Sequence, residues 1–545
     1  MRRFTCVNIQ SPRHVAVMGY PMNSFSRCLL VAALGFSWHA HAVTFVVTRT
    51  DDPSPDGCQP GDCSLREAAI AADGNDEFAA RDVISLPAGA YALTLGELPM
   101  HQNLEIAGSG SAQTSVNCGA TALLNAFDDA LFIHGLTLQT TSGFVLAVDG
   151  GLKLDDIRVP VGGGSISGGG NNAFSTAVEV SNSELRDSLD CTQSHGSCTI
   201  SDSHLLTLTF FGEFPGPKLL MQRSTIDGTL DPDYSSGLLM RVADGITIED
   251  SVITDTTYGM TFSNPFNAAP GEVVLTRLRY VRNGGPINFE EPATVTVVDS
   301  EFRDNSRINP TQVGAFPAAA WAREGSDWTI SGTTFSGNIG NSDAGGALLI
   351  EGGAHVLVDN STFSGNSFTV AAAAAHARGA AIGYRDDANT TNITLRHVTI
   401  VAPTFLPAGI DGTTIGGVGG ESNLVLNVIN SVLRGTCGLS AGAMDTAIGN
   451  VESPGDTCDF SSASNLVSAS SGDLALGTLG DHGGLTPTYE PGAASVALGA
   501  APAALCLPLD QRGFQRAYPD LDADCDAGAV ERDADERIFA DRFES

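Results

Sequence analysis

The feature that most constrains the fold of this 545-residue chain is an internal repeat with fixed apolar positions and spacers of variable length. Twelve apolar residues, 19 to 37 residues apart, serve as anchors of the repeat: Leu138, Ile157, Leu185, Leu205, Ile226, Ile253, Tyr280, Phe302, Phe335, Phe363, Ile400 and Leu433. Every anchor has a second apolar residue five positions earlier: Ile133, Leu152, Val180, Ile200, Met221, Ile248, Leu275, Val297, Ile330, Val358, Leu395 and Val428. Eight anchors also have a Ser or Thr two positions earlier. Fixed inner positions with free spacers indicate the coils of a solenoid.

The spacing of the repeat indicates which kind of repeat protein the chain forms. Apolar residues also recur seven positions before most anchors, so positions −7 and −5 share one face of a strand, and the odd step to the anchor implies a bend before a second strand. No helical period accompanies the pattern. A parallel β-helix fits these coils, whereas the blades of a β-propeller need about 40 to 45 residues each.

Asparagines add a second repeated position. Asn283, Asn305, Asn338 and Asn366 each follow an anchor by three residues. Stacked asparagines that point inward satisfy backbone polar groups at the bends of a β-helix. We therefore expect an asparagine ladder inside the solenoid.

Three sets of motifs resemble known families. The sequences FRDN at 302–305, FSGN at 335–338 and 363–366, and GGAL at 345–348 resemble the repeats of right-handed parallel β-helix proteins, including chlamydial polymorphic outer-membrane proteins. CSLREA at 63–68, followed by IAA at 70–72 and LPAGAY at 86–91, resembles the CSLREA domain of secreted bacterial β-helix proteins. LG at 479–480, GGLTPT at 483–488, DQRG at 510–513 and CDAGAVE at 525–531 resemble the choice-of-anchor Q domain, although GAASVALG at 492–499 lacks that family's usual Asp.

These features predict an all-β chain, a right-handed parallel β-helix with a short N-terminal capping helix. Ser64 and Glu67 stand at the spacing of a capping box, which predicts a helix over 65–72 that closes the first coil. The expected organisation is a signal peptide at 1–42, a CSLREA-like cap at 43–100, the β-helix at 101–450, an anchor-Q-like region at 451–531 and a tail at 532–545.

The N-terminus predicts export. Arg27 precedes an apolar run from Cys28 to Trp38, and Ala-His-Ala at 40–42 offers a cleavage site after Ala42. Met22 is a candidate for the true start. No later segment reaches the roughly 20 apolar residues of a membrane span, so no transmembrane segment is expected. The predicted location is outside the cell, as a secreted or cell-surface protein.

Export affects how the cysteines are interpreted. In an oxidising compartment, close pairs of cysteines favour local disulfides over zinc sites. The predicted disulfides are Cys58–Cys63, Cys191–Cys198, Cys437–Cys458 and Cys506–Cys525. Cys118 remains, and we expect it to be a buried free thiol.

The charge limits the partners. Asp and Glu number 62 against 28 Lys and Arg, a formal net charge of −34. An acidic surface repels phosphate backbones, which excludes nucleic acid as the expected partner. An extracellular glycan or a surface protein is the partner class that remains, and the sequence leaves the oligomeric state open.

Charged residues of alternating sign recur three positions before successive anchors: Asp202, Arg223, Asp250, Arg277 and Asp299. Stacked one strand apart, they would form an ion-pair ladder that holds the coils in register, and the protein would act in adhesion or extracellular interaction. The alternative is a polysaccharide-active enzyme of pectate-lyase type, with carboxylates as calcium ligands and an Arg as base. Its candidate catalytic residues are Asp250, Arg277, Arg279, Asp299 and Glu301.

One segment offers calcium ligands. Asp520, Asp522, Asp524 and Glu531 occupy positions 1, 3, 5 and 12 of an EF-hand-like loop, but Cys525 stands where the loop needs Gly. The competing interpretation is that this segment belongs to the end motif and its disulfide. Calcium is the one cofactor that the sequence suggests.

Overall fold

A computed structural model describes residues 42–532 except 75–80, 101–102, 128–129, 170–176, 194–195, 213–217, 231–236, 242–243, 264–270, 307–316, 342–344, 370–378, 386–388, 407–409, 419–422, 440–441 and 517–522. The described residues belong to one compact unit. The predicted signal peptide before Ala42, the tail after Arg532, and the calcium candidates Asp520 and Asp522 lie outside the described residues. Within the described part of the chain, no helix is both long and apolar enough to cross a membrane.

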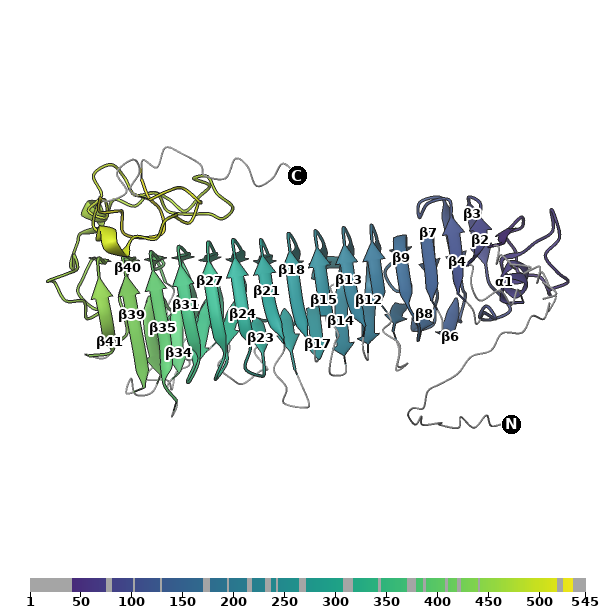
Figure 1. The fold of residues 1–545 in the computed structure, drawn as a ribbon, viewed down its shortest axis with the longest axis horizontal. Helices are drawn as coiled ribbons and strands as arrows, with labels where there is room; N and C mark the ends of the chain where they lie inside the picture. Colours follow the sequence, from purple (N-terminus) through teal and green to yellow (C-terminus); the bar gives the residue numbers. More distant parts are fainter. Residues whose placement is uncertain are drawn as a thin grey trace, which may run out of the picture. The chain divides into compact units, whose positions relative to one another are not determined.

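The chain forms a right-handed parallel β-helix, as predicted, with three rows of parallel strands (Figure 1). Row 1 consists of β1 (Thr44–Val46), β2 (Asp82–Leu86), β4 (Leu104–Gly108), β7 (Leu131–Gln139), β9 (Leu152–Val159), β11 (Val178–Ser181), β13 (Ser197–Ser201), β15 (Lys218–Gln222), β18 (Gly245–Glu249), β21 (Glu272–Thr276), β24 (Thr294–Val298), β27 (Asp327–Ser331), β31 (His355–Asp359), β35 (Thr391–Arg396), β39 (Leu424–Ile429) and β41 (Met444–Ile448).

Row 2 consists of short strands that follow the bend after row 1. Its members are β3 (Gly89–Ala92), β5 (Thr114–Asn117), the ends of β7 and β9, the starts of β12 (Glu184–Gln193) and β14 (His204–Gly212), β16 (Thr225–Asp227), β19 (Val252–Thr254), β22 (Arg279–Val281), β25 (Glu301–Arg303), β28 (Thr334–Ser336), β32 (Thr362–Ser364), β36 (Thr399–Val401), β40 (Val432–Arg434) and β42 (Val451–Ser453).

Row 3 closes each coil. It contains β6 (Leu124–Phe127), β8 (Phe144–Val148), β10 (Ser165–Gly168), the later parts of β12 and β14, β17 (Gly237–Arg241), β20 (Met260–Phe262), β23 (Ile287–Phe289), β26 (Ala320–Ala322), β30 (Leu348–Glu351), β34 (Ile382–Arg385) and β38 (Ile415–Val418). A separate small sheet contains β29 (Ile339–Asn341), β33 (Ser367–Thr369) and β37 (Ile410–Asp411).

The repeat positions are the core of the solenoid. All twelve anchors and all twelve residues five positions earlier are buried. From Leu185 onward, anchors stack directly from coil to coil, and the rings of Phe302, Phe335 and Phe363 lie parallel with centroids 4.6 and 4.8 Å apart. Burial of these side chains in a continuous stack is the main source of stability for the fold.

One anchor was assigned wrongly by two residues. The residue that pairs with Leu185 on the next coil is Val159, and Ile157 pairs with Leu136 instead. Both Ile157 and Val159 face inward because alternate residues of β9 share a face, so an apolar pattern alone does not distinguish them. The matching residue five positions before Val159 is Leu154, which pairs with Val180.

Polar ladders satisfy the backbone at the bends. The hydroxyls two positions before the anchors accept hydrogen bonds from backbone N–H groups of the preceding coil, as Ser203 Oγ does from Ser183 N at 3.1 Å. In the asparagine ladder, Asn305 Nδ2 donates to Asn338 Oδ1 and Asn338 Nδ2 donates to Asn366 Oδ1, both at 2.9 Å. The predicted ladder is confirmed.

The residue three positions before each anchor, with Val159 in place of Ile157, has a left-handed backbone, with φ of 49° at Asp202, 46° at Arg223 and 50° at Arg277. This conformation makes the turn from row 1 to row 2, and it favours Gly, Asn and Asp over branched or bulky side chains. The side chains of this position therefore point out at the bend, and the charged ladder lies at the tips of the row 1 strands.

Helix α1 (Leu65–Asp73) lies beyond the first strands of the stack (Figure 1). Ser64 caps it, and the side chains of Ser64 and Glu67 form the predicted capping box. Buried Arg66 binds the Asp52 carboxylate with Nε at 2.7 Å. Strands β1, β2 and β3, which precede residue 100, belong to the same stack as the later coils.

The C-terminal segment, residues 470–532, starts with α2 (Ser471–Leu474) and returns along the solenoid, above the tips of β31, β35 and β39 (Figure 1). It covers the outer side of row 2. Gln511, within the DQRG motif, donates from Nε2 to Thr334 Oγ1 at 2.8 Å and accepts from Thr362 Oγ1 at 2.6 Å. The side-chain amide of Gln511 thus binds two neighbouring coils of the solenoid.

The structure contains the four predicted disulfides, Cys58–Cys63, Cys191–Cys198, Cys437–Cys458 and Cys506–Cys525. Cys118 is a buried free thiol, as expected, and burial raises its pKa to about 12. Four disulfides are consistent with an extracellular protein.

His397 connects the solenoid to the C-terminal segment and gives a pH prediction. Burial, followed by the Arg516 guanidinium, lowers the pKa of His397 well below 6.5, and its neutral Nε2 accepts from Leu507 N at 3.3 Å and from Asn430 Nδ2 at 3.0 Å. A lowered folded pKa gives stability that is present above the unfolded pKa and is lost as pH falls below about 6.5.

We expect His397→Asn to remove this pH dependence, because Asn occupies the same left-handed position at Asn360 and Asn430. The free energy of unfolding of the wild type should fall relative to the variant by up to about 1.4 kcal/mol per pH unit below about pH 6.5. Chemical denaturation of both proteins between pH 7.5 and 5 measures the difference. Parallel curves would contradict the assignment.

Candidate functional site

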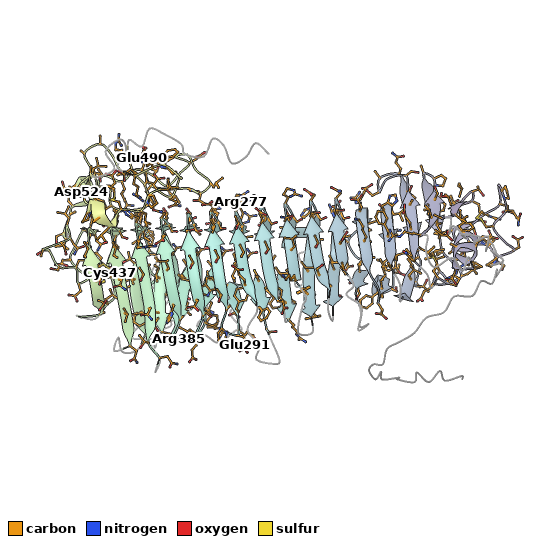
Figure 2. All side chains as sticks on the ribbon, viewed as in Figure 1. Arg277, Glu291, Arg385, Cys437, Glu490 and Asp524 are labelled. Carbon is orange, nitrogen blue, oxygen red and sulfur yellow. A yellow bond between two sulfur atoms is a disulfide. The ribbon has the colours of Figure 1, made fainter. Side chains whose placement is uncertain are left out.

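The predicted charged residues lie together at the bend between rows 1 and 2. Asp250 and Arg277 follow β18 and β21 on neighbouring coils, and Arg277 projects at the tip of its strand (Figure 2). Arg279 starts the row 2 strand of the same coil as Arg277, Glu301 starts that of the next coil, and the two residues pair in register. Asp299 stands at the bend before Glu301.

The ladder is built from ion pairs between neighbouring coils. Arg277 binds Asp250 in bidentate fashion, with Nη2 2.8 Å from Oδ2, and it also binds Glu249. This arrangement raises the pKa of Arg277, and it lowers the pKa of Asp250 through the hydrogen bond from Arg277. Arg223 binds Asp202 in the same bidentate way, at 2.8 and 2.7 Å. The predicted row of five charged residues therefore consists of two ion pairs, Asp202–Arg223 and Asp250–Arg277, followed by Asp299.

Asp299 differs from the other members. Burial raises its pKa, and the positive charge of Arg277 opposes this shift. The carboxylate lies over Gly332 of the next coil, where a Cβ would come within 2.1 Å of Oδ1. Glycine at 332 is required both by this contact and by its φ of 62°.

Arg279 and Glu301 form a further contact on row 2, with Nε 3.3 Å from Oε2. Arg303 lies near the same carboxylate, at 3.4 Å. Glu301 thus lies between two guanidinium groups, and the five candidate catalytic residues lie on three adjoining coils.

A second ladder was missed in the sequence. Arg282 binds Asp255 with Nε 2.8 Å from Oδ1, two positions after the anchors Tyr280 and Ile253. These residues also have left-handed backbones. The alternation Asp255, Arg282 and Asp304 was the available signal, and it repeats the sign pattern of the first ladder.

Over the middle of the solenoid, the residue before each row 2 anchor points outward, and these residues keep solvent exposure from Arg158 to Arg279, whereas Glu301 is buried. We call this surface the open face; it presents one outward residue per coil: Arg158, Glu184, His204, Thr225, Val252, Arg279 and Glu301. Consecutive parallel strands are about 4.8 Å apart, so the open face is about 30 Å long.

The open face is bordered at one end by the C-terminal segment and at the other by a turn of an earlier coil. Among the described residues, the hydrogen bonds of the C-terminal segment to row 2 begin at Thr334, which pairs with Glu301 and donates to Pro487 O at 2.6 Å. At the other end is the turn that contains Ser111 and Ala112. Ser111 is held on Asp156, with N and Oγ 3.0 and 2.6 Å from the carboxylate oxygens.

A hollow of about 630 Å³ lies against the Ser111 turn. Its lining comes from three sources, the turn itself, the bend and the outward side of row 2: Ser111, Ala112, Ile157, Arg158, Asn182, Ser183, Glu184, Asp202, Ser203, His204, Arg223 and Thr225. Asp202 and Arg223, two members of the predicted ladder, line this hollow. The turn at 111–112 did not stand out in the sequence.

The calcium candidates that the structure describes have other partners. Asp524 accepts from Ala503 N at 2.9 Å, and Glu531 accepts from Asp526 N at 2.9 Å and from Arg516 at 3.3 Å. Within the described ranges, no group of three or more His, Cys, Asp or Glu side chains is arranged to hold a metal ion. A calcium loop at 520–531 stays a prediction.

The ladder gives a stability prediction. Arg277→Ala should lower the free energy of unfolding by about 1 kcal/mol, because it removes two ion pairs from a half-buried guanidinium. Lys218→Ala is the control, since Lys218 is exposed and makes no ion pair among the described residues. Equal melting temperatures for both variants and the wild type would show that the ladder does not stabilise the coils.

Comparisons with known proteins agree with the fold. Residues 216–400 match the family model of the right handed beta helix region. The tailspike protein 3 of bacteriophage CBA120 is similar in structure, with 13% identity, a TM-score of 0.34 and coverage of 74% of this chain and 59% of that chain. This chain therefore spans less than two thirds of the tailspike chain.

Two further solved structures are similar at the same low level. The catalytic unit of a GH87 alpha-1,3-glucanase from Streptomyces thermodiastaticus has 16% identity, a TM-score of 0.33 and coverage of 77% of this chain and 70% of its own. Pectate lyase Pel9A has 11% identity, a TM-score of 0.25 and coverage of 90% and 98%. No curated protein matches the chain. These similarities concern the fold alone.

Proposed function

We propose that this protein is an extracellular binding protein that holds an extended glycan along the open face without cleaving it. The observation that carries the proposal is the contrast within row 2. From Thr334 onward the chain covers row 2 with its own C-terminal segment, whereas the outward residues from Arg158 to Arg279 keep solvent exposure and are polar except for Val252.

The state of the charged residues favours binding over catalysis. A general base must give up its proton near the working pH. Arg277 is held by two carboxylates that raise its pKa, so it is a poor base. Guanidinium–carboxylate pairs instead present donors and acceptors side by side, which suits the hydroxyls of a sugar.

A pair of tryptophan variants tests the position of the ligand. Val252 is an outward, partly exposed residue in the middle of the open face, and Thr247 is an outward residue of row 1 on the same coil. Residues 43–545 are applied to an array of neutral and acidic oligosaccharides. We expect the wild type and Thr247→Trp to bind and Val252→Trp to lose binding.

The proposal fails if the wild type binds no glycan on the array, or if Val252→Trp binds as well as Thr247→Trp. Binding to a surface protein rather than to a glycan would appear as the first of these results.

A further inference from the structure

We infer that the hollow beside the Ser111 turn is a terminal subsite that takes the end sugar of a neutral glycan. The inference rests on the proposed function and specifies the ligand of the open face, namely an uncharged oligosaccharide whose chain end stops at the turn.

The shape of the hollow indicates that the bound glycan chain ends there, because the turn at 110–113 closes one side of the hollow. The turn at 110–113 stands on the bend side of row 2 and is fixed by three hydrogen bonds: the two from Ser111 to Asp156 and one from Thr137 Oγ1 to Ser111 O at 2.7 Å. Gly110 N adds a bond to Gly135 O at 3.1 Å. A wall that is bonded at both its side chain and its backbone does not move aside for a continuing chain.

In the other direction the hollow has no such wall. The lining passes from Glu184 to His204 and Thr225, and the same row of outward side chains continues to Val252 and Arg279. A ligand that starts in the hollow can therefore extend coil by coil along the open face.

The charges of the lining indicate a neutral ligand. Arg158 and Arg223 are matched by Glu184 and Asp202, and each arginine already contacts one of these carboxylates, at 3.3 and 2.7 Å. All four side chains keep solvent access, with 50% of Arg158, 55% of Arg223, 30% of Glu184 and 42% of Asp202 exposed. The two positive and two negative charges of these pairs therefore balance, and the chain as a whole, with a net charge of −34, repels a uronate.

Hydroxyl groups fit this lining better than a single charge does. Each hydroxyl both donates and accepts, so neighbouring hydroxyls of one sugar can donate to a carboxylate and accept from the adjacent guanidinium. Asn182 and Thr225 add further polar groups at the edge of the hollow. At about 630 Å³, the hollow has the size of a small-ligand site.

The test fills the hollow from its wall. Ala112 is exposed and lines the hollow, and Gln113 is the next residue, is also exposed and does not line it. Binding of residues 43–545 to linear oligosaccharides of glucose, galactose and mannose and to oligogalacturonates is measured by titration calorimetry. We expect Ala112→Trp to weaken binding of the neutral oligosaccharides by about tenfold or more, and Gln113→Trp to leave it unchanged.

Equal melting temperatures establish that both variants fold. The inference is overturned if Ala112→Trp binds within about twofold of Gln113→Trp, or if the wild type prefers oligogalacturonates. In either case a loss of binding in Val252→Trp would leave the proposed function standing. If no oligosaccharide binds to the wild type, the inference and the proposed function both fail.

Discussion

Replacement of Val297 by aspartate is expected to prevent the chain from folding into a stable β-helix. Val297 is 1% exposed and is stacked between Leu275 and Ile330 of the neighbouring coils. A carboxylate at this position would be buried on every side with no partner, a change that costs more than about 4 kcal/mol. Chemical denaturation and the yield of soluble protein measure the loss.

Thr296→Asp is the matched control for this prediction. Thr296 is adjacent on β24, but its side chain points outward because side chains alternate along a strand. We expect the control to stay within about 0.5 kcal/mol of the wild type. A folded Val297→Asp protein with the stability of Thr296→Asp would contradict the inward assignment of the repeat.

Arg516→Met is expected to release the C-terminal segment from the solenoid. The Arg516 side chain is buried, with Nη2 2.9 Å from Asn360 Oδ1 and 2.9 Å from Gly528 O, and Nη1 3.3 Å from Glu531 Oε2. Its removal leaves the buried carboxylates of Glu531 and Asp526 without this counter-charge. Breaking such a buried pair costs about 3–5 kcal/mol.

Limited proteolysis measures the release of the segment. In the variant, cleavage within 470–532 should become fast while the rest of the chain remains resistant, because rows 1 to 3 do not depend on Arg516. Arg223→Met is the control, since it breaks an exposed ion pair of small value. Equal resistance of the two variants would show that Arg516 does not hold the segment.

The solenoid was predictable because the apolar residues that form its core lie close together in the sequence and recur in every coil. An apolar residue recurs five positions before every anchor, and each pair of positions is buried. The error at Ile157 arose for the same reason, since β9 presents Ile157 and Val159 to the same interior and only the pairing with Leu185 separates them. An apolar pattern shows which side chains of a strand point inward. It does not show which of them pairs with a given residue of the neighbouring coil.

The candidate site was predictable only in part. The alternating charges were visible, and the structure pairs Asp202 with Arg223 and Asp250 with Arg277. The burial of Asp299 depends on Gly332, which lies 33 positions away in the sequence, and the repeat did not assign a role to that glycine.

The walls of the open face could not be read from the sequence. Gln511 contacts Thr334 across a separation of 177 residues, and Ser111 contacts Asp156 across 45. The resemblance to an anchor domain identified the DQRG motif at 510–513 but not the surface to which it binds. Contacts of this range depend on how many coils separate the partners, and a repeat of variable spacing does not fix that number.

We propose that the open face binds a glycan and does not cleave it. The most direct measurement incubates residues 43–545 with neutral and acidic polysaccharides, with and without calcium, and records the bound polysaccharide together with any new reducing ends or unsaturated uronate. The account predicts bound neutral polysaccharide and no new ends under either condition. Calcium-dependent release of unsaturated uronate that disappears in Arg277→Ala would contradict it and would establish the enzyme.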